Sequence, residues 1–130
     1  MQIFTIGYEG VTQAELIAAL SCAGVKLVAD VRAVPLSRRP GFSKNILAAG
    51  LREAGIDYIG LKALGTPPAG REAARKHDLA GLERIYSGQL ELPEAMVQAA
   101  QLIEMARERP TALLCFERSP DCCHRSLLIA

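Results

Sequence analysis

The sequence has almost no net charge. Its 15 lysines and arginines are balanced by 14 aspartates and glutamates over 130 residues, which leaves a formal charge of +1. A protein that binds nucleic acid over a broad surface usually carries a strong positive field. The composition therefore excludes a global basic field, and any basic surface must be local.

Long apolar runs and a leader pattern are lacking as well. Charge or glycine interrupts the longest apolar runs well before the roughly 18 residues that a membrane-spanning helix needs. The amino terminus, MQIFTIGYEG, lacks the order of charged and then apolar residues that marks a signal peptide. We therefore expect a cytoplasmic protein with no membrane partner. In such a chain the four cysteines are expected to be thiols and not a disulfide framework.

The chain also lacks internal repeats, low-complexity segments and linkers, while half of its residues are apolar. One α/β domain over residues 1–130 is therefore the natural expectation. The last residues, CHRSLLIA, resemble the first turns of a helix whose amphipathic pattern does not finish. We expect the domain to be truncated within this helix.

Apolar segments typical of strands alternate with amphipathic segments typical of helices. Strands are expected over residues 2–7, 25–34, 56–61 and 111–117, and helices over residues 12–24, 44–55 and 93–110. This alternation predicts parallel βαβ units. The expected fold class is α/β: a Rossmann-like, three-layer αβα architecture with a mostly parallel sheet of at least four strands.

Two segments carry more specific expectations. Residues 65–88 are rich in glycine, proline and charge, and we expect a loop followed by one or two short helical pieces. In the last helix, Met96, Val97, Ala100 and Ile103 form one apolar stripe. Such a stripe is expected to face the core.

The loop after the second strand is the strongest candidate for a binding site, because open parallel sheets bind ligands beyond the carboxyl ends of their strands. Residues 32–44 include four basic residues and no acid. Guanidinium groups and hydroxyls suit phosphate or carboxylate oxygens, and an aromatic ring among them can stack on a base. The candidate ligand-binding residues of this region are Asp30, Arg32, Ser37, Arg38, Phe42 and Lys44.

Asp30 and Arg32 lie on the same side of the expected strand, since side chains alternate along a strand. Two ionisable groups near the end of a central strand are costly unless they are paired or used, which favours a site. The alternative is a solvated basic loop in which Arg32 pairs with Asp30 or with Glu117.

Two other loops give weaker signals. In GYEG, two glycines flank Tyr8 just before a helix, and both a plain turn and a phosphate-binding loop fit this pattern. Tyr8 is therefore a further candidate for ligand binding. Lys62 and Thr66 follow the third strand and could serve a ligand, although exposed loops commonly have this composition.

Three of the four cysteines and one of the two histidines lie in CFERSPDCCHRS, residues 115–126. The spacing does not supply the four ligands of a structural zinc site, nor the cysteine, five residues and arginine of a phosphatase-like nucleophile. An anion-binding helix start clamped by Arg125 is the remaining interpretation. The candidate catalytic residues here are Glu117, Cys123 and His124. No metal site is expected, and a site formed by Cys115, Cys123 and His124 ranks last.

Four segments resemble, in the right order, the bacterial and archaeal family called domain of unknown function 488. These segments are TIGYEG, DVRAVPLSRRPGFSK, GIDYIGLKALG and LLCFERSPDCCHRSLLIA. The family motifs fall on Gly7, Tyr8, Asp30, Arg32, Pro35, Ser37, Arg38, Gly41, Phe42, Lys44, Cys115, Glu117, Pro120, Cys123, His124 and Arg125. The resemblance implies an α/β fold, favours Cys123 over Cys122 as the thiol of interest, and is nearly silent about activity. Family chains usually continue into a last strand, which the given sequence lacks.

These observations lead to one main hypothesis and two alternatives. The main hypothesis is a phosphate or nucleotide pocket formed by the loops after the second and fourth strands, in a hydrolase or transferase acting on a phosphate-bearing small molecule. The first alternative is an accessory module in which loop 32–44 grips the nucleic acid backbone and Phe42 stacks on a base. The second alternative is a Cys/His metal-binding protein. The sequence names no cofactor and leaves the oligomeric state and the enzyme question open.

Overall fold

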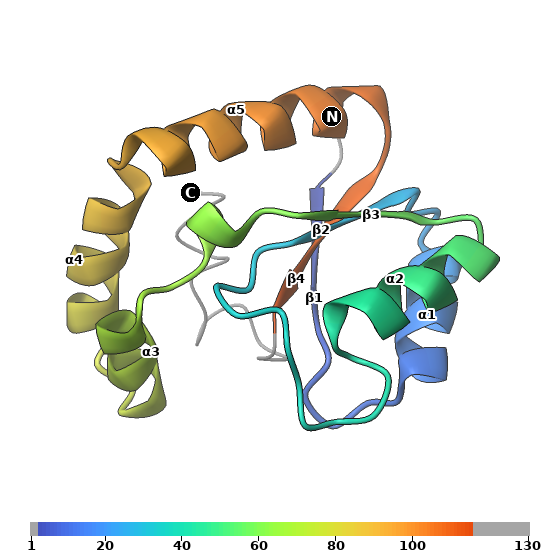
Figure 1. Ribbon diagram of the computed structural model, residues 1–130, viewed down its shortest axis with the longest axis horizontal. Coiled ribbons are helices and arrows are strands. Elements are labelled where there is room, and N and C mark those ends of the chain that lie inside the picture. Colours follow the sequence, from blue (N-terminus) through green and yellow to red (C-terminus); the bar gives the residue numbers. More distant parts are fainter. Residues whose placement is uncertain (1–2, 116–130) are drawn as a thin grey trace.

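The computed structural model describes residues 3–115 of the chain, in which strands and helices alternate (Figure 1). In chain order the elements are β1 (Ile3–Gly7), α1 (Gln13–Cys22), β2 (Leu27–Asp30), α2 (Lys44–Glu53), β3 (Asp57–Gly60), the 3-10 helix η1 (Lys62–Leu64), α3 (Pro68–Arg75), α4 (Leu79–Leu90), α5 (Pro93–Glu108) and β4 (Thr111–Cys115).

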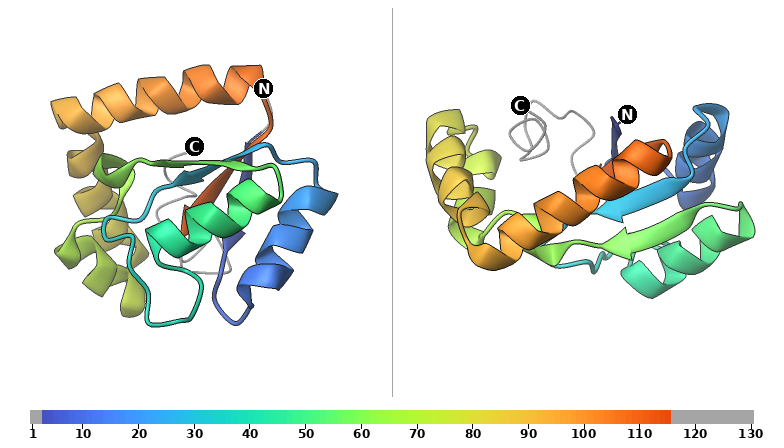
Figure 2. Two further views of the ribbon diagram at one scale, coloured as in Figure 1. Left: turned by 45° about the vertical axis from the view of Figure 1, so that its right-hand side comes forward. Right: turned by 90° about the horizontal axis from the view of Figure 1, so that it is seen from above.

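The four strands form one parallel sheet in the order β1-β4-β2-β3. All five residues of β4 are buried, which confirms its expected place in the middle of the sheet. Helices α1 and α2 cover one face and α5 covers the other (Figure 1). Helices α3 and α4 pack together beyond the carboxyl ends of β2 and β3 (Figure 2). The predicted three-layer α/β architecture is therefore confirmed.

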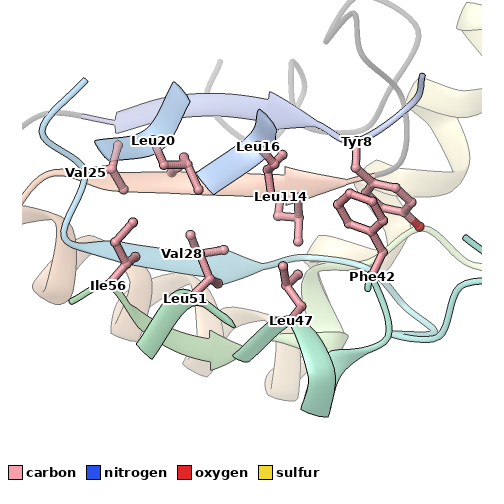
Figure 3. Packing of buried hydrophobic residues seen from close by; sticks show 11 residues of the cluster. Tyr8, Leu16, Leu20, Val25, Val28, Phe42, Leu47, Leu51, Ile56 and Leu114 are labelled. Atoms are coloured by element: carbon pink, nitrogen blue, oxygen red, sulfur yellow. The ribbon is translucent and has the colours of Figure 1, made fainter. Parts of the chain in front are cut away.

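The core consists of two clusters, one on each face of the sheet. Leucines of α1 and α2 pack against the first face, where Val28 and Leu114 point toward them (Figure 3). Ala29 and Leu113, one residue along each strand, point to the opposite face and contact α5. Because neighbouring side chains alternate, each central strand supplies apolar residues to both clusters.

The predicted orientation of the last helix is wrong. Met96, Val97 and Ile103 are 60%, 58% and 43% exposed, whereas Leu102 and the alanines at positions 95 and 106 are buried. The helix carries two apolar stripes, and the stripe with the small alanines faces the sheet. Small side chains let the helix axis approach the strands closely, which gives dense packing with Leu102 as the main apolar contact.

The second strand is shorter than predicted: β2 ends at Asp30 and not at residue 34, because Arg32 turns its side chain back to bond Asp30. Other local signals have the expected outcome. Thr12 and Glu15 form a capping box at the start of α1. Gly24 and Gly55 end α1 and α2 with φ of +76°, a conformation that favours glycine. Residues 65–88 form a short loop, α3 and most of α4, as anticipated. None of the helices in residues 3–115 is both long enough and apolar enough to cross a membrane.

Candidate functional site

The connections after β2 and β3 leave the sheet on opposite faces. The chain after β2 enters α2 on one face, whereas the chain after β3 passes through η1 and reaches α5 on the other. Open parallel sheets bind ligands at such a divergence. A cavity of about 370 Å³ lies there, and its lining includes Asp30, Arg32, Lys44, Asn45, Tyr58 and Lys62.

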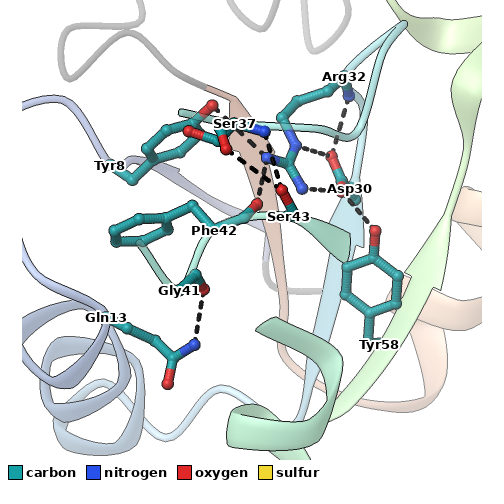
Figure 4. A network of polar contacts seen from close by, with 9 residues as sticks. All are labelled: Tyr8, Gln13, Asp30, Arg32, Ser37, Gly41, Phe42, Ser43 and Tyr58. Carbon is teal, nitrogen blue, oxygen red and sulfur yellow. Dashed lines mark hydrogen bonds and ion pairs between the residues drawn. The ribbon is translucent and has the colours of Figure 1, made fainter. Parts of the chain in front are cut away.

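A buried ion pair lines this cavity, and Figure 4 shows its hydrogen bonds. Asp30 and Arg32 are only 1% and 5% exposed. The Nε atom of Arg32 donates to Oδ1 of Asp30 at 2.8 Å, and Nη2 donates to Oδ2 at 2.6 Å. The backbone N–H of Arg32 also donates to Oδ1, at 3.1 Å. This bidentate geometry supplies the pairing that a buried carboxylate and guanidinium require.

Tyr58, in β3, is a further donor to Asp30. Its hydroxyl donates to the Oδ2 atom of Asp30. Burial, the hydrogen bond to Asp30 and the charge of Asp30 together raise the pKa of the Tyr58 phenol above its ordinary value. Burial lowers the pKa of Arg32, but the hydrogen bonds and charge of Asp30 outweigh it and hold this pKa above its ordinary value. Both groups therefore stay protonated at neutral pH.

The raised pKa of Tyr58 predicts how stability depends on alkaline pH. Above pH of about 10, the unfolded chain releases the phenol proton before the folded chain does, so this contribution to stability is lost as pH rises. We expect the urea midpoint of Tyr58→Phe to fall less steeply than that of the wild type between pH 9 and 11. At neutral pH the variant should lose about 1 kcal/mol, because Asp30 loses one donor. Parallel midpoint curves above pH 9 would contradict this account.

The other edge of the Arg32 guanidinium holds the basic loop in place. Its Nη1 atom donates to the carbonyl oxygen of Phe42 at 2.6 Å and to the hydroxyl of Tyr8 at 3.5 Å. The Tyr8 and Phe42 rings are stacked, with centroids 4.6 Å apart, and the guanidinium lies 5.4 Å from the centroid of Tyr8. Arg32 therefore links the ends of β1 and β2 to the far end of the loop.

Further hydrogen bonds fix the rest of loop 33–43. The backbone N–H of Ser37 donates to the hydroxyl of Ser43 at 3.0 Å, and the Lys44 N–H donates to the Pro35 carbonyl at 3.0 Å. From α1, the Nε2 atom of Gln13 donates to the Gly41 carbonyl at 2.6 Å (Figure 4). The loop is thus tied to β2, α1 and the start of α2.

Positive groups also line the cavity. Lys44 and Asn45 occupy the first turn of α2, and Lys62 begins η1. Ser43, at the N-cap of α2, makes no side-chain capping bond, and the first turn has no acidic residue. The Lys44 N–H bonds to the Pro35 carbonyl, but no acidic side chain or side-chain cap offsets the positive end of the α2 dipole. Glu94, from the first turn of α5, also lines the cavity.

The structure brings together part of the predicted site. Asp30, Arg32 and Lys44 line one cavity. The buried, stacked rings of Tyr8 and Phe42 lie beside Arg32, which bonds to the Tyr8 hydroxyl and to the Phe42 carbonyl. Two other predicted residues have different positions: Ser37 lies half-buried within the loop, and Arg38 is exposed and does not belong to the lining of this cavity. The remaining candidates, namely Glu117, Cys123, His124 and Arg125, lie outside the described residues.

Metal ligands are not gathered in the described part of the chain. Within residues 3–115, no group of three or more His, Cys, Asp or Glu side chains could hold a metal ion. Cys115 is buried at the end of β4, as expected for a small packing residue. The other two residues of the low-ranked metal hypothesis, Cys123 and His124, lie outside the described residues.

Sequence reasoning missed several polar residues of the cavity. Tyr58 in a strand resembles a packing residue, and Asn45 and Glu94 resemble ordinary first-turn residues of helices. Lys62 lies in a loop whose composition is common on protein surfaces, so its sequence context does not distinguish a ligand-binding lysine from a solvent-exposed one. Their position in the sequence could have revealed two of these residues. Tyr58 and Lys62 lie at and just after the carboxyl end of β3, where parallel sheets bind their ligands.

The fold and the site define an α/β domain with a polar cavity at the carboxyl edge of a parallel sheet. A family model described as domain of unknown function DUF488 matches residues 12–130. The chain belongs to this family, which the sequence motifs had indicated. No curated protein and no solved structure matches the chain.

Proposed function

We propose that this domain binds a phosphate-bearing small molecule in the cavity at the carboxyl ends of β2 and β3. The observation that carries the proposal is that Lys44, Lys62 and the first turn of α2, which has no side-chain cap and no acidic residue, line one cavity. Ammonium groups and the N-terminus of a helix both attract anions.

The charge balance within the cavity supports an anionic ligand. Asp30 is neutralised by Arg32 through two side-chain hydrogen bonds, so this pair adds little net field. The remaining charged side chains of the lining are Lys44, Lys62 and Glu94. Two lysines and a helix dipole outweigh one carboxylate, and the cavity is therefore positive on balance.

Arg32 has a positioning role in this proposal. Its guanidinium already donates to Asp30, to the Phe42 carbonyl and to Tyr8. It therefore orients the wall of the cavity and the basic loop, while the lysines and the first turn of α2 supply the contacts to phosphate. Asn45 and the Tyr58 ring add polar and apolar surface beside them.

The size of the cavity and the position of Phe42 favour a small ligand over a nucleic acid strand. A volume of about 370 Å³ lies within the usual range of small-molecule sites. The Phe42 ring is 1% exposed and stacks on Tyr8, so it does not present a free face to a base. Glu117, Cys123 and His124 remain the predicted residues for any chemical step.

Titration calorimetry with inorganic phosphate tests this proposal. We expect Lys44→Ala and Lys62→Ala each to weaken binding by roughly tenfold, because each removes one charge-assisted contact. The matched control is Lys26→Ala, an exposed lysine at the amino end of β2, which should leave the affinity unchanged.

Two outcomes would contradict the proposal. Equal losses in all three lysine variants would indicate a general charge effect and not a site. A salt dependence with a logarithmic slope of about four or more, measured with single-stranded oligonucleotide, would favour the nucleic acid alternative, because that slope counts several released counterions.

A further inference from the structure

A second cavity adjoins the first and has a different chemistry. It measures about 260 Å³ and is lined by Ala33, Val34, Pro35, Leu36, Lys44 and Lys62. Pro35 and the two lysines line both cavities. The lysines therefore stand between a polar cavity and an apolar surface, which we call the shelf, formed by residues 33–36.

The shelf has the properties of a binding surface for an apolar group. None of its four side chains can form a hydrogen bond, and Val34 and Leu36 are 48% and 67% exposed. Exposed apolar side chains are common when scattered, but these two are gathered beside the two lysines of the proposed phosphate site. Such a neighbourhood suits a ligand that is charged at one end and apolar at the other.

The shelf is also held rigidly, so little ordering is required when a ligand binds. The Pro35 carbonyl accepts the N–H of Lys44 at 3.0 Å, and Ser37 bonds to Ser43 just beyond the shelf. On the other side, the backbone of Ala33 lies directly against Gly65. A preorganised surface retains more of the free energy of apolar burial on binding.

We infer that the ligand is a water-soluble phosphate ester whose phosphate lies between Lys44 and Lys62 and whose apolar substituent lies on the shelf. The inference rests on the proposed function and adds to it the class of ligand. In this inference, Val34 and Leu36 determine which substituent is preferred, and the two lysines provide the affinity for the phosphate group.

Calorimetry with inorganic phosphate and phenyl phosphate tests the inference. We expect the wild type to bind phenyl phosphate roughly tenfold more tightly, from burial of part of the ring. Leu36→Ser should reduce this preference roughly threefold and leave the affinity for inorganic phosphate unchanged. The matched control is Leu79→Ser on α4, where the leucine is 55% exposed and does not line the cavity of the shelf, and there the preference should persist.

Methyl NMR gives an independent readout. Phenyl phosphate should shift the methyl signals of Val34 and Leu36, and inorganic phosphate should leave them nearly unchanged. If the protein binds inorganic phosphate and phenyl phosphate with equal affinity, the inference is wrong but the proposed function stands. If it binds neither compound, the proposed function itself is wrong. Binding to vesicles containing phosphatidic acid, with no preference for the soluble ester, would overturn the inference in favour of a membrane lipid.

Discussion

Replacing Arg32 with methionine is expected to destabilise the domain by about 3–5 kcal/mol. The substitution keeps much of the side-chain volume but removes two of the hydrogen bonds that reach the Asp30 carboxylate. That carboxylate is 1% exposed, so water cannot replace the lost donors. The Phe42 carbonyl loses a donor as well. Urea unfolding monitored by circular dichroism measures the effect.

The controls separate loss of pairing from loss of a charged residue. Arg38→Met removes an exposed arginine from the same loop and should change stability by no more than about 0.5 kcal/mol. Combining Arg32→Met with Asp30→Asn should recover most of the loss, because no charge then remains buried without a partner. If the double variant were as unstable as Arg32→Met alone, the ion pair would not be the source of the effect.

The sequence predicted the architecture well because its signals are local. Capping residues, the glycines after α1 and α2, and the alternation of strand-like and helix-like segments all act within a few residues. The order β1-β4-β2-β3 is not local, since it depends on which strands pair across more than 80 residues. The orientation of α5 was also beyond local signals, because periodicity alone cannot rank a stripe containing Met96 against one containing Leu102 and alanines.

The candidate site was predictable only where adjacent residues interact. Asp30 ends β2 and Arg32 lies two positions further along the chain, so the sequence offered their pairing as the alternative to a ligand-binding role for Arg32. Tyr58 reaches Asp30 from 28 positions away, and Glu94 reaches the cavity from another helix. Such contacts depend on strand register and helix placement, which periodicity does not specify. The sequence therefore pointed to Asp30, Arg32 and Lys44, and missed Tyr58 and Glu94.

Hydrogen bonds tie the loop after β2 to the neighbouring elements. Arg32 fixes the loop to the strand, while Gln13 bonds to Gly41 from α1. Loops that carry function are commonly more mobile than the elements that they connect. Here the hydrogen bonds place Lys44 and the apolar residues 33–36 in a fixed relation, which is what recognition of a two-part ligand needs.

The contact of this loop with η1 gives the second large prediction: Gly65→Ala should destabilise the domain by about 3 kcal/mol or more. Gly65 is buried and has φ of −79°, which alanine can adopt, so the cost does not arise from the backbone conformation. A Cβ atom at this position would lie 2.2 Å from the backbone nitrogen of Ala33 and 2.4 Å from its Cα atom. Backbone atoms cannot rotate away as a side chain does, so the shelf or η1 must move.

Gly88→Ala is the matched control for Gly65→Ala, because it adds the same methyl group where there is space. Gly88 lies in α4, and a Cβ atom there would meet no atom within 4 Å. This control should be more stable than the wild type by about 0.5–1 kcal/mol, since alanine favours helices over glycine. Urea midpoints measure both variants. Because the clash displaces Ala33 relative to Lys62, Gly65→Ala should also abolish the preference for phenyl phosphate. An unchanged urea midpoint and an intact preference would show that the shelf does not depend on this close contact.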